Sequence, residues 1–149
     1  MTADRSKFGA LLGAEVHAEW PPDLLSDALS WFADQLEEDP SREGWLVWYA
    51  LMKEPDRLVL AASGGFIGKP RDGIVEVGYS VLPAYQRRGL ATEMVRALVD
   101  WALAQPNVRE VVAEVDQANV PSLCLLRRLN FREVGPGRDP GHLRFRLSA

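Results

Sequence analysis

Apolar side chains recur at steps of three and four residues in three stretches of the chain, as they do along amphipathic helices. These stretches predict helices over residues 22–38, 90–104 and 121–129. Pro40 follows the first stretch and Pro106 the second, and proline cannot continue a helix. Each predicted helix therefore has a defined end and one apolar face to turn toward a core.

Short apolar runs rich in β-branched and aromatic residues separate these helices and predict strands. The runs are residues 45–52, 58–62, 74–81, 108–115, 131–134 and 143–147. The glycine-rich segment Gly64 to Gly68 lacks the spacing of a dinucleotide-binding loop and no helical pattern follows it, so we expect a turn between strands there. Residues 135–141 are rich in glycine and proline and predict a loop. Strands that alternate with helices indicate an α/β fold.

The composition narrows the kind of protein. A length of 149 residues fits a single domain spanning residues 1–149, and 47% hydrophobic with 26% charged residues is ordinary globular usage. A net charge of -4 argues against a nucleic-acid partner, which would need clustered Lys and Arg. No stretch of about 18 apolar residues occurs, and the first residues do not resemble an export signal, so we expect neither a membrane span nor export.

Cysteine and histidine usage argues against metal binding. Cys124 is the only cysteine, which excludes an intrachain disulfide and a cysteine metal cluster and favours the reducing cytoplasm. His17 and His142 are isolated and lack the partner spacing of a metal site. We therefore predict a cytoplasmic protein without a metal.

The segment Gln86-Arg87-Arg88-Gly89-Leu90-Ala91 lies between a predicted strand and a predicted helix. The first N–H groups of a helix are unpaired and its dipole is positive there, so an anion such as a pyrophosphate would bind. Gly89 would allow a ligand to approach the backbone closely, and two arginines add positive charge. The alternative, at about equal odds for these six residues alone, is an arginine-bearing turn that merely begins a helix.

Two further features match a known family. The pattern Gln-x-x-Gly-x-Ala resembles the coenzyme A motif of the GNAT N-acetyltransferases, and the segment from Asn119-x-x-Ser122 to Leu129-Asn130-Phe131 resembles their second motif. The resemblance covers roughly residues 45–147. Together with Ser122, the sequence Glu76-Val77-Gly78-Tyr79 looks most similar to the branch containing ribosomal-protein N-terminal acetyltransferases. The resemblance implies a mixed, mostly antiparallel central sheet flanked by helices.

The resemblance also implies which residues bind acetyl-CoA, the expected co-substrate. The thioester carbonyl would dock at the backbone N–H groups around Val81 and Leu82, and the helix that begins near Asn119 and Ser122 would lie along the pantetheine arm. The pyrophosphate would be held by Gln86, Arg87, Arg88, Gly89, Leu90, Ala91 and Thr92. Asn119 is also a favoured helix N-cap, and the cap and ligand roles are compatible. Asn130 replaces the family's usual glycine and suits a left-handed helix end.

The chemistry requires a base for the amine and a proton for the departing thiolate. Strand alternation places Glu76 on the face opposite Tyr79, and Glu76 is the leading candidate for the base. At equal weight, Glu76 is a solvated carboxylate or the partner of an arginine. Glu114 and water remain open as alternatives. Leu126 occupies the position where many family members have the tyrosine that protonates the thiolate, so Ser122 or water would have to assist.

The first third of the chain departs from the family or carries no clear chemistry. Residues 4–12 look helical where GNAT chains usually begin with a strand, so that strand is missing or shifted, and the bare sheet edge suggests a homodimer. We prefer core or dimer packing over a substrate wall, at about two to one, for Trp20, Trp31, Trp45 and Trp48. The acidic run from Asp34 to Asp39 is expected to be solvated rather than to attract a cationic substrate.

Two functions remain at this point. The favoured one is an acetyl-CoA-dependent N-acetyltransferase that modifies a primary amine of unknown identity, on a small molecule or a peptide. The alternative is a non-catalytic acyl-CoA-binding sensor or interaction module on the same fold. Both need the coenzyme site, and only turnover separates them.

Overall fold

The computed structural model of the chain describes residues 2–21 and 23–149. Pro22, the first residue of the predicted helix 22–38, lies outside the described residues. The elements are α1 (Thr2–Leu12), β1 (Glu15–Val16), α2 (Asp23–Glu38), the 3-10 turn η1 (Pro40–Arg42), β2 (Val47–Lys53), β3 (Leu58–Phe66), β4 (Ile74–Val81), the 3-10 turn η2 (Pro83–Tyr85), α3 (Leu90–Leu103), β5 (Glu110–Asp116), α4 (Val120–Arg128), β6 (Arg132–Pro136) and β7 (His142–Ser148).

The strands form one mixed sheet in which antiparallel pairs predominate. Its order is β1-β3-β4-β5-β7-β6, with β2 paired to β3 off this path. The pairs β1–β3 and β4–β5 are parallel, and the remaining pairs are antiparallel. This arrangement confirms the predicted fold class.

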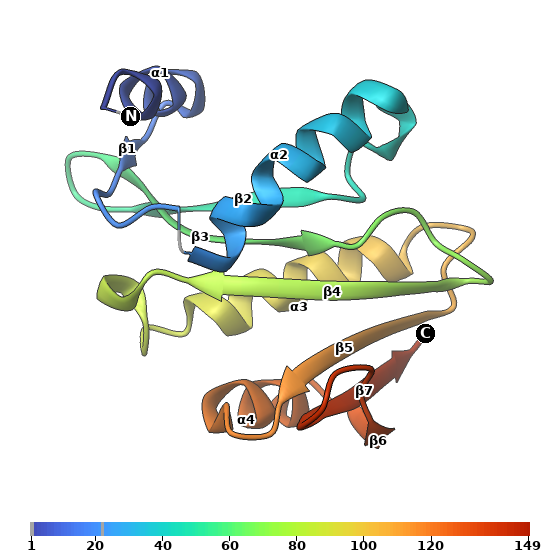
Figure 1. Cartoon of the computed structure of the whole chain (residues 1–149). Helices are drawn as coiled ribbons and strands as arrows, with labels where there is room; N and C mark the ends of the chain where they lie inside the picture. The colour runs from blue at the N-terminus through green and yellow to red at the C-terminus, as the bar shows by residue number, and fades with distance from the viewer. Residues whose placement is uncertain (1, 22) are drawn as a thin grey trace.

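The sheet opens in its middle, between β4 and β5. These parallel strands pair only at their first residues, the last pair being Glu76 with Val112. Beyond this point β4 continues to pair with β3 on its other edge, as far as Val81. Figure 1 shows β4 and β5 close together at one end and diverging toward the other. The second half of β4 therefore has one edge without a strand partner among the described residues.

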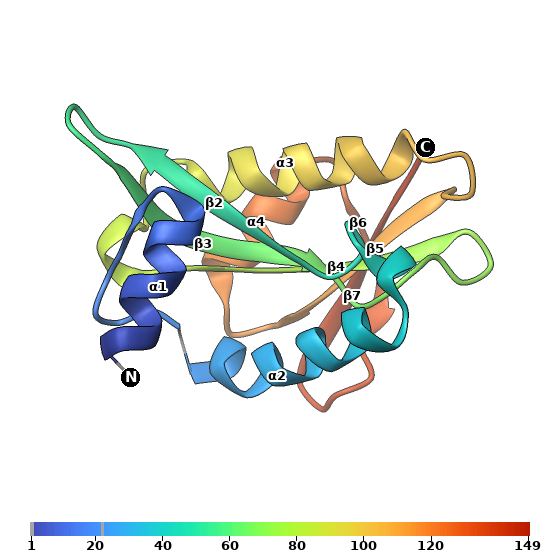
Figure 2. The same ribbon diagram turned by 90° about the horizontal axis from the view of Figure 1, so that it is seen from above.

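Helices cover both faces of the sheet (Figure 2). α3 and α4 lie on one face, where their apolar sides pack against β4, β5 and β7 around fully buried Val95, Val111, Leu126 and Phe145. α1 and α2 lie on the other face, and a second cluster that includes Trp20, Leu60 and Tyr85 forms on the α1 side. The amphipathic patterns of residues 90–104 and 121–129 are thus explained by burial against the sheet.

The structure corrects the prediction of a turn at Gly64 to Gly68. Gly64, Gly65 and Phe66 belong to β3, and the connection to β4 begins after them. A side chain at Gly65 would place its Cβ 1.7 Å from the carbonyl oxygen of Leu46. Glycine is therefore required here for close approach to the neighbouring segment, a contact that the local sequence does not reveal. The predicted loop 135–141 is also shorter, since β6 runs to Pro136.

The start of the chain is helical, as predicted. α1 occupies residues 2–12, and the first strand is reduced to the two residues of β1. β1 pairs with β3 through Glu15 and Val16. The family's usual first strand is therefore short in this protein, with a helix in front of it.

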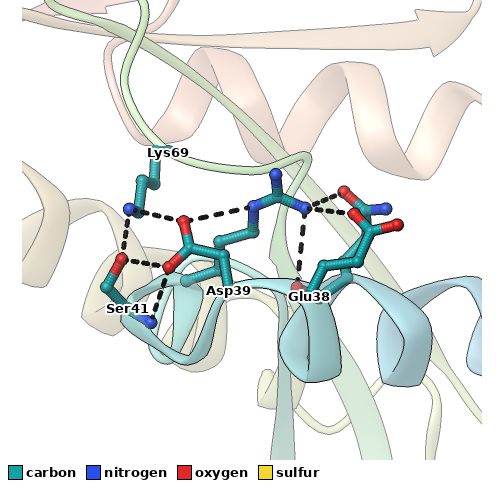
Figure 3. A network of polar contacts seen from close by, with 6 residues as sticks. Glu38, Asp39, Ser41 and Lys69 are labelled. Atoms are coloured by element: carbon teal, nitrogen blue, oxygen red, sulfur yellow. Dashed lines mark hydrogen bonds and ion pairs between the residues drawn. The ribbon is translucent and has the colours of Figure 1, made fainter.

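The acidic run at the end of α2 has a structural role. Asp39 accepts hydrogen bonds from the Ser41 N–H at 3.1 Å and from Lys69 at 2.9 Å, and Glu38 lies 3.6 Å from Arg42 (Figure 3). The Ser41 hydroxyl and Lys69 lower the pKa of Asp39 to about 2. This network attaches the end of α2 to the connection between β3 and β4.

Of the four tryptophans in the first third, Trp20 and Trp45 pack in the core, as preferred, whereas Trp48 contacts a core ring but is 39% exposed. Trp45 lies 4.7 Å from the ring of Trp101 on α3, and Trp48 lies 5.5 Å from the same ring. Trp20 is buried beside Phe8, with ring centroids 4.8 Å apart. Trp31 is exposed on α2.

Candidate functional site

The connection between β4 and α3 forms a loop of unpaired N–H groups. Arg87 and Gly89 both have left-handed backbone, with φ of 63° and 75°, and Gly89 is the N-cap residue of α3. Within the part of the chain that the structure describes, the N–H groups of residues 87–92 make no backbone hydrogen bond. Such a concave run of N–H groups at the positive end of a helix is suited to bind a phosphate. This geometry supports the predicted anion site.

Side chains of the same loop add charge and fix its shape. Arg87 and Arg88 are exposed, and the Arg88 guanidinium lies 5.5 Å from the centre of the Tyr85 ring. Gln86 donates from Nε2 to the carbonyl oxygen of Val81 at 3.1 Å. Gln86 therefore joins the loop to the end of β4, which is a positioning role that the sequence alone did not indicate.

The backbone of β4 points polar groups into the opening of the sheet. The backbone carbonyl of Glu76 accepts a hydrogen bond from the Ile67 N–H, and the Leu82 N–H donates to the Ala61 carbonyl at 3.0 Å. The backbone N–H and C=O groups of even-numbered residues in β4 therefore point toward β3. Because strand backbone groups alternate in direction, the N–H and C=O groups of Tyr79 and Val81 face the opening. The prediction for Val81 is compatible with this geometry. Leu82, by contrast, already uses its N–H within the fold and has no N–H to offer a thioester.

The start of α4 lies on the α3 side of the sheet. The Asn119 side chain accepts from the Ser122 N–H at 3.2 Å, which confirms its role as a helix N-cap. Ser122 is half-buried, and its side chain lies near the hydroxyl of Tyr79 from β4 without forming a hydrogen bond to it. Leu126, one turn further, is 0% exposed and packs in the core. The coenzyme roles of Asn119 and Ser122 stay predictions.

On the opposite side of the sheet, two carboxylates meet one arginine. One nitrogen of Arg138, Nη2, lies 2.7 Å from each carboxylate oxygen of Glu76, and Nε lies 2.6 Å from Oε2 of Glu114. Arg144 approaches Glu114 at 3.4 Å. The side chains of Glu76 and Glu114 are 17% and 8% exposed, whereas that of Arg138 is 65% exposed. Of the alternatives left open for Glu76, the contact with an arginine is observed, and its role as a base stays a prediction.

The two carboxylates differ in acidity. Burial raises the pKa of Glu76, and Arg138 opposes this effect without cancelling it. Burial also acts to raise the pKa of Glu114, but the N–H and guanidinium of Arg138 outweigh it and leave the pKa below its usual value. Glu76 is therefore the more basic of the pair and the better proton acceptor.

Sequence reasoning missed Arg138 and the Tyr79 hydroxyl. Arg138 lies in the predicted loop, 62 residues from Glu76, and no local pattern connects the two. Tyr79 was assigned only to the face of β4 opposite Glu76. Its position opposite Ser122 depends on how α4 packs against the sheet, which is a long-range feature.

The surface shape does not itself mark the site. An open depression of about 540 Å³ lies beside α1 and β1 and is lined by Arg5 to Val16, away from Gly89 and Glu76. In the described residues no group of three or more His, Cys, Asp or Glu side chains could hold a metal ion. No helix in the described ranges is long and apolar enough to cross a membrane.

The fold and the site define an α/β protein in which a strand, a loop of unpaired N–H groups and a helix border an opening in the sheet, with paired carboxylates beside it. The family profile described as "Acetyltransferase (GNAT) domain" matches residues 2–132. The chain belongs to this family, and it is a GNAT N-acetyltransferase. The predicted family is thereby confirmed.

Similar sequences carry the same description. The chain is 28% identical over 121 residues to the uncharacterized N-acetyltransferase YjdG of Bacillus subtilis, covering 80% of this chain and 71% of that protein. It is 30% identical over 106 residues to the uncharacterized N-acetyltransferase p20 of Bacillus licheniformis, covering 70% and 59%. An N-alpha-acetyltransferase of Saccharolobus solfataricus is 34% identical over 58 residues, covering 39% and 35%.

Solved structures show the same fold. The ribosomal-protein-S5-alanine acetyltransferase of Vibrio fischeri aligns with a TM-score of 0.67 at 19% identity, covering 82% of this chain and 71% of that one. The yncA protein of Salmonella typhimurium, solved with its cofactor acetyl-CoA, aligns with a TM-score of 0.60 at 23% identity, covering 78% and 72%. At these identities the likeness concerns the fold.

Proposed function

We propose that this protein transfers the acetyl group of acetyl-CoA directly to a primary amine, with Glu76 accepting the amine proton itself or through water. The observation that carries this proposal is the opening between β4 and β5, together with the unpaired N–H groups of residues 87–92 in the connection that follows β4. A ligand with a polar arm and a pyrophosphate fits these two features together. The family and a relative's structure with acetyl-CoA support the choice of ligand.

The loop, the end of β4 and the start of α4 would each bind a different part of acetyl-CoA. N–H groups of Arg88 to Thr92 would hold the pyrophosphate, and the arginines would add charge at its edge. The Val81 N–H, which faces the opening, would donate to the thioester carbonyl, where negative charge develops during transfer. Asn119 and Ser122 at the start of α4 would border the pantetheine arm from the other side.

Glu76, Glu114 and Arg138 would form the site that binds the acceptor amine. Gly78 lies beside Glu76 on the same face of β4, and a Cβ added there would meet no atom within 4 Å. The acceptor can therefore approach Glu76 along this face. Glu76 and Glu114 attract a cation, as their contacts with Arg138 show, and the acceptor amine would take the place of the exposed Arg138 side chain beside them. Glu76 would then take the proton that the amine loses on attack.

The experiment is a thiol-release assay with acetyl-CoA and a panel of amines, namely polyamines, amino acids, aminoglycosides and peptides with free N-termini. We expect amine-dependent release of coenzyme A and an acceptor mass increased by one acetyl group. Binding of coenzyme A, measured by calorimetry, is determined in parallel. Binding without release for the whole panel would favour the acyl-CoA sensor, and absence of binding would overturn both functions.

The acceptor class is proposed from relatives. Two similar proteins are described as a ribosomal-protein-S5-alanine acetyltransferase and an N-alpha-acetyltransferase, so we propose peptide N-termini as the first acceptors to test. Peptides beginning with Ala and Ser, compared with the same peptides blocked at the N-terminus, distinguish the α-amine from lysine side chains. Acetylation of the blocked peptides would refute this choice.

We also propose that residues 1–149 act as one domain in the cytoplasm, as a homodimer. Among the described strands β2 pairs with β3 alone, which leaves a strand edge for a second copy. Sedimentation at micromolar concentration would show a mass of twice 16.6 kDa. A monomer mass at all concentrations would exclude the dimer.

A further inference from the structure

The hydroxyl of Tyr79 is a buried polar group that neither the fold nor the proposed reaction uses. Two side-chain polar atoms in the described residues are buried without a hydrogen-bond partner, Trp20 Nε1 and the Tyr79 hydroxyl oxygen. An unpaired buried donor is costly, and native proteins contain few of them. The unpaired hydroxyl of Tyr79 therefore suggests that this group has a function other than packing in the core.

The position of Tyr79 links the opening to α4. Its backbone N–H and C=O face the opening between β4 and β5, because Glu76 and Leu82 face β3. Its ring, on the same face as Val77, packs against the α3 and α4 core. Ser122, at the first turn of α4, has its side chain near this hydroxyl, although the pair does not meet the geometry of a hydrogen bond. The hydroxyl thus lies between β4 and the start of α4.

The same region lacks the proton donor that the reaction calls for. Leu126 of α4 is fully buried and apolar, so the helix supplies no acid at that position. When the C–S bond of the thioester breaks, its electron pair goes to sulfur, and a nearby O–H would stabilise the thiolate. Burial raises the pKa of Tyr79, so its O–H stays protonated over the working pH range.

We propose that Tyr79 is a catalytic residue that donates a hydrogen bond from its hydroxyl to the sulfur of coenzyme A as the thioester C–S bond breaks. The bond forms only when ligand is present, which accounts for the unpaired hydroxyl in the free protein. Ser122 would orient the Tyr79 hydroxyl and is a positioning residue. This assignment rests on the proposed function, because it requires the acyl arm to lie in the opening.

The test is Tyr79→Phe, which removes only the hydroxyl. We expect kcat to fall about tenfold to a hundredfold, as for loss of a hydrogen bond to a charged group, with the KM for acetyl-CoA changed less than twofold. Tyr49→Phe, on β2, is the matched control and should retain wild-type kinetics. A kcat for Tyr79→Phe within twofold of wild type would overturn the proposal.

Binding provides a readout that needs no turnover. The wild-type protein should bind coenzyme A more tightly than desulfo-coenzyme A, increasingly so as the pH rises toward the pKa of the coenzyme thiol, and Tyr79→Phe should abolish this difference. The melting temperature of ligand-free Tyr79→Phe should equal or exceed that of wild type, since the variant removes an unpaired buried group. A variant that keeps the preference for coenzyme A would refute the contact with sulfur. Wild-type protein that shows the preference but no turnover would refute the proposed function while supporting this contact.

Discussion

Replacement of Gly89 by alanine tests most directly the proposal that this loop binds a phosphate. Gly89 has φ of 75°, and a Cβ added there would meet no atom within 4 Å, so Gly89→Ala causes backbone strain without a clash. Left-handed backbone costs an L-residue about 1–2 kcal/mol. Relief of this strain would turn the N–H groups of residues 89–91 away from the ligand. The substitution therefore affects both stability and coenzyme affinity.

A second glycine isolates the effect on stability. Gly13, which follows α1, has φ of 66° and equally open space around a Cβ. Gly13→Ala and Gly89→Ala should each lower the free energy of unfolding by about 1 kcal/mol and the melting temperature by about 3 °C. Urea unfolding and thermal denaturation measure these changes. Both variants remain folded at 25 °C, since domains of this size are usually stable by about 5–15 kcal/mol.

Only Gly89→Ala should weaken coenzyme binding. Loss of one hydrogen bond from an N–H group to a charged phosphate costs about 1.5–3 kcal/mol, which raises the Kd for coenzyme A about tenfold to a hundredfold. Titration calorimetry with coenzyme A measures this Kd, and pantetheine, which lacks the pyrophosphate, serves as a ligand that should be insensitive. If Gly89→Ala bound coenzyme A as tightly as Gly13→Ala, the phosphate would not bind at this loop.

Three further predictions concern charged groups. Glu76→Gln should lower kcat/KM at neutral pH by at least about a hundredfold while calorimetry shows an unchanged Kd for coenzyme A, and unaltered kinetics would shift the base to Glu114 or water. Arg138→Gln removes the positive charge that lowers the pKa of Glu76, so this pKa should rise. Because the base acts only when deprotonated, the acidic limb of the kcat/KM profile should move to higher pH. An unchanged acidic limb would show that Glu76 is not the base. The pKa of Asp39 is lowered to about 2, so its contribution to stability is complete above its ordinary pKa of 3.8 and is lost as pH falls toward 2. Asp39→Asn should reduce this loss in urea unfolding between pH 4 and pH 2, and an identical pH dependence in both proteins would contradict the network.

The sequence was sufficient where local patterns decide the structure. The helix at residues 90–104, the strand at residues 74–81 and the turn with unpaired N–H groups between them each have their own periodicity, glycine or charge. Asn130 has left-handed backbone with φ of 68°, as its place at a helix end predicts. These features depend on residues within a few positions of each other, which is the range that sequence patterns report.

Features that depend on tertiary packing could not be predicted from local sequence patterns. Gly64 and Gly65 have turn-like composition, yet they extend β3 because another segment approaches them closely. The sequence left open whether Glu76 has an arginine partner and could not indicate Arg138, since the β6–β7 loop that carries Arg138 is distant in sequence. The Leu82 N–H was expected to donate to the thioester carbonyl, but it donates a hydrogen bond to the carbonyl of Ala61 instead. In each case the deciding partner is distant in sequence.

The change of partners along β4 has a consequence for hydrogen exchange. Gly78 and Ser80 direct their amides toward β3, whereas Tyr79 and Val81 direct theirs toward the opening. In the free protein, protection should therefore alternate from one residue to the next along the second half of β4. A ligand arm in the opening would act as a substitute strand and, within the second half of β4, slow exchange at Tyr79 and Val81 only. The sheet would then be completed by the molecule on which the enzyme acts.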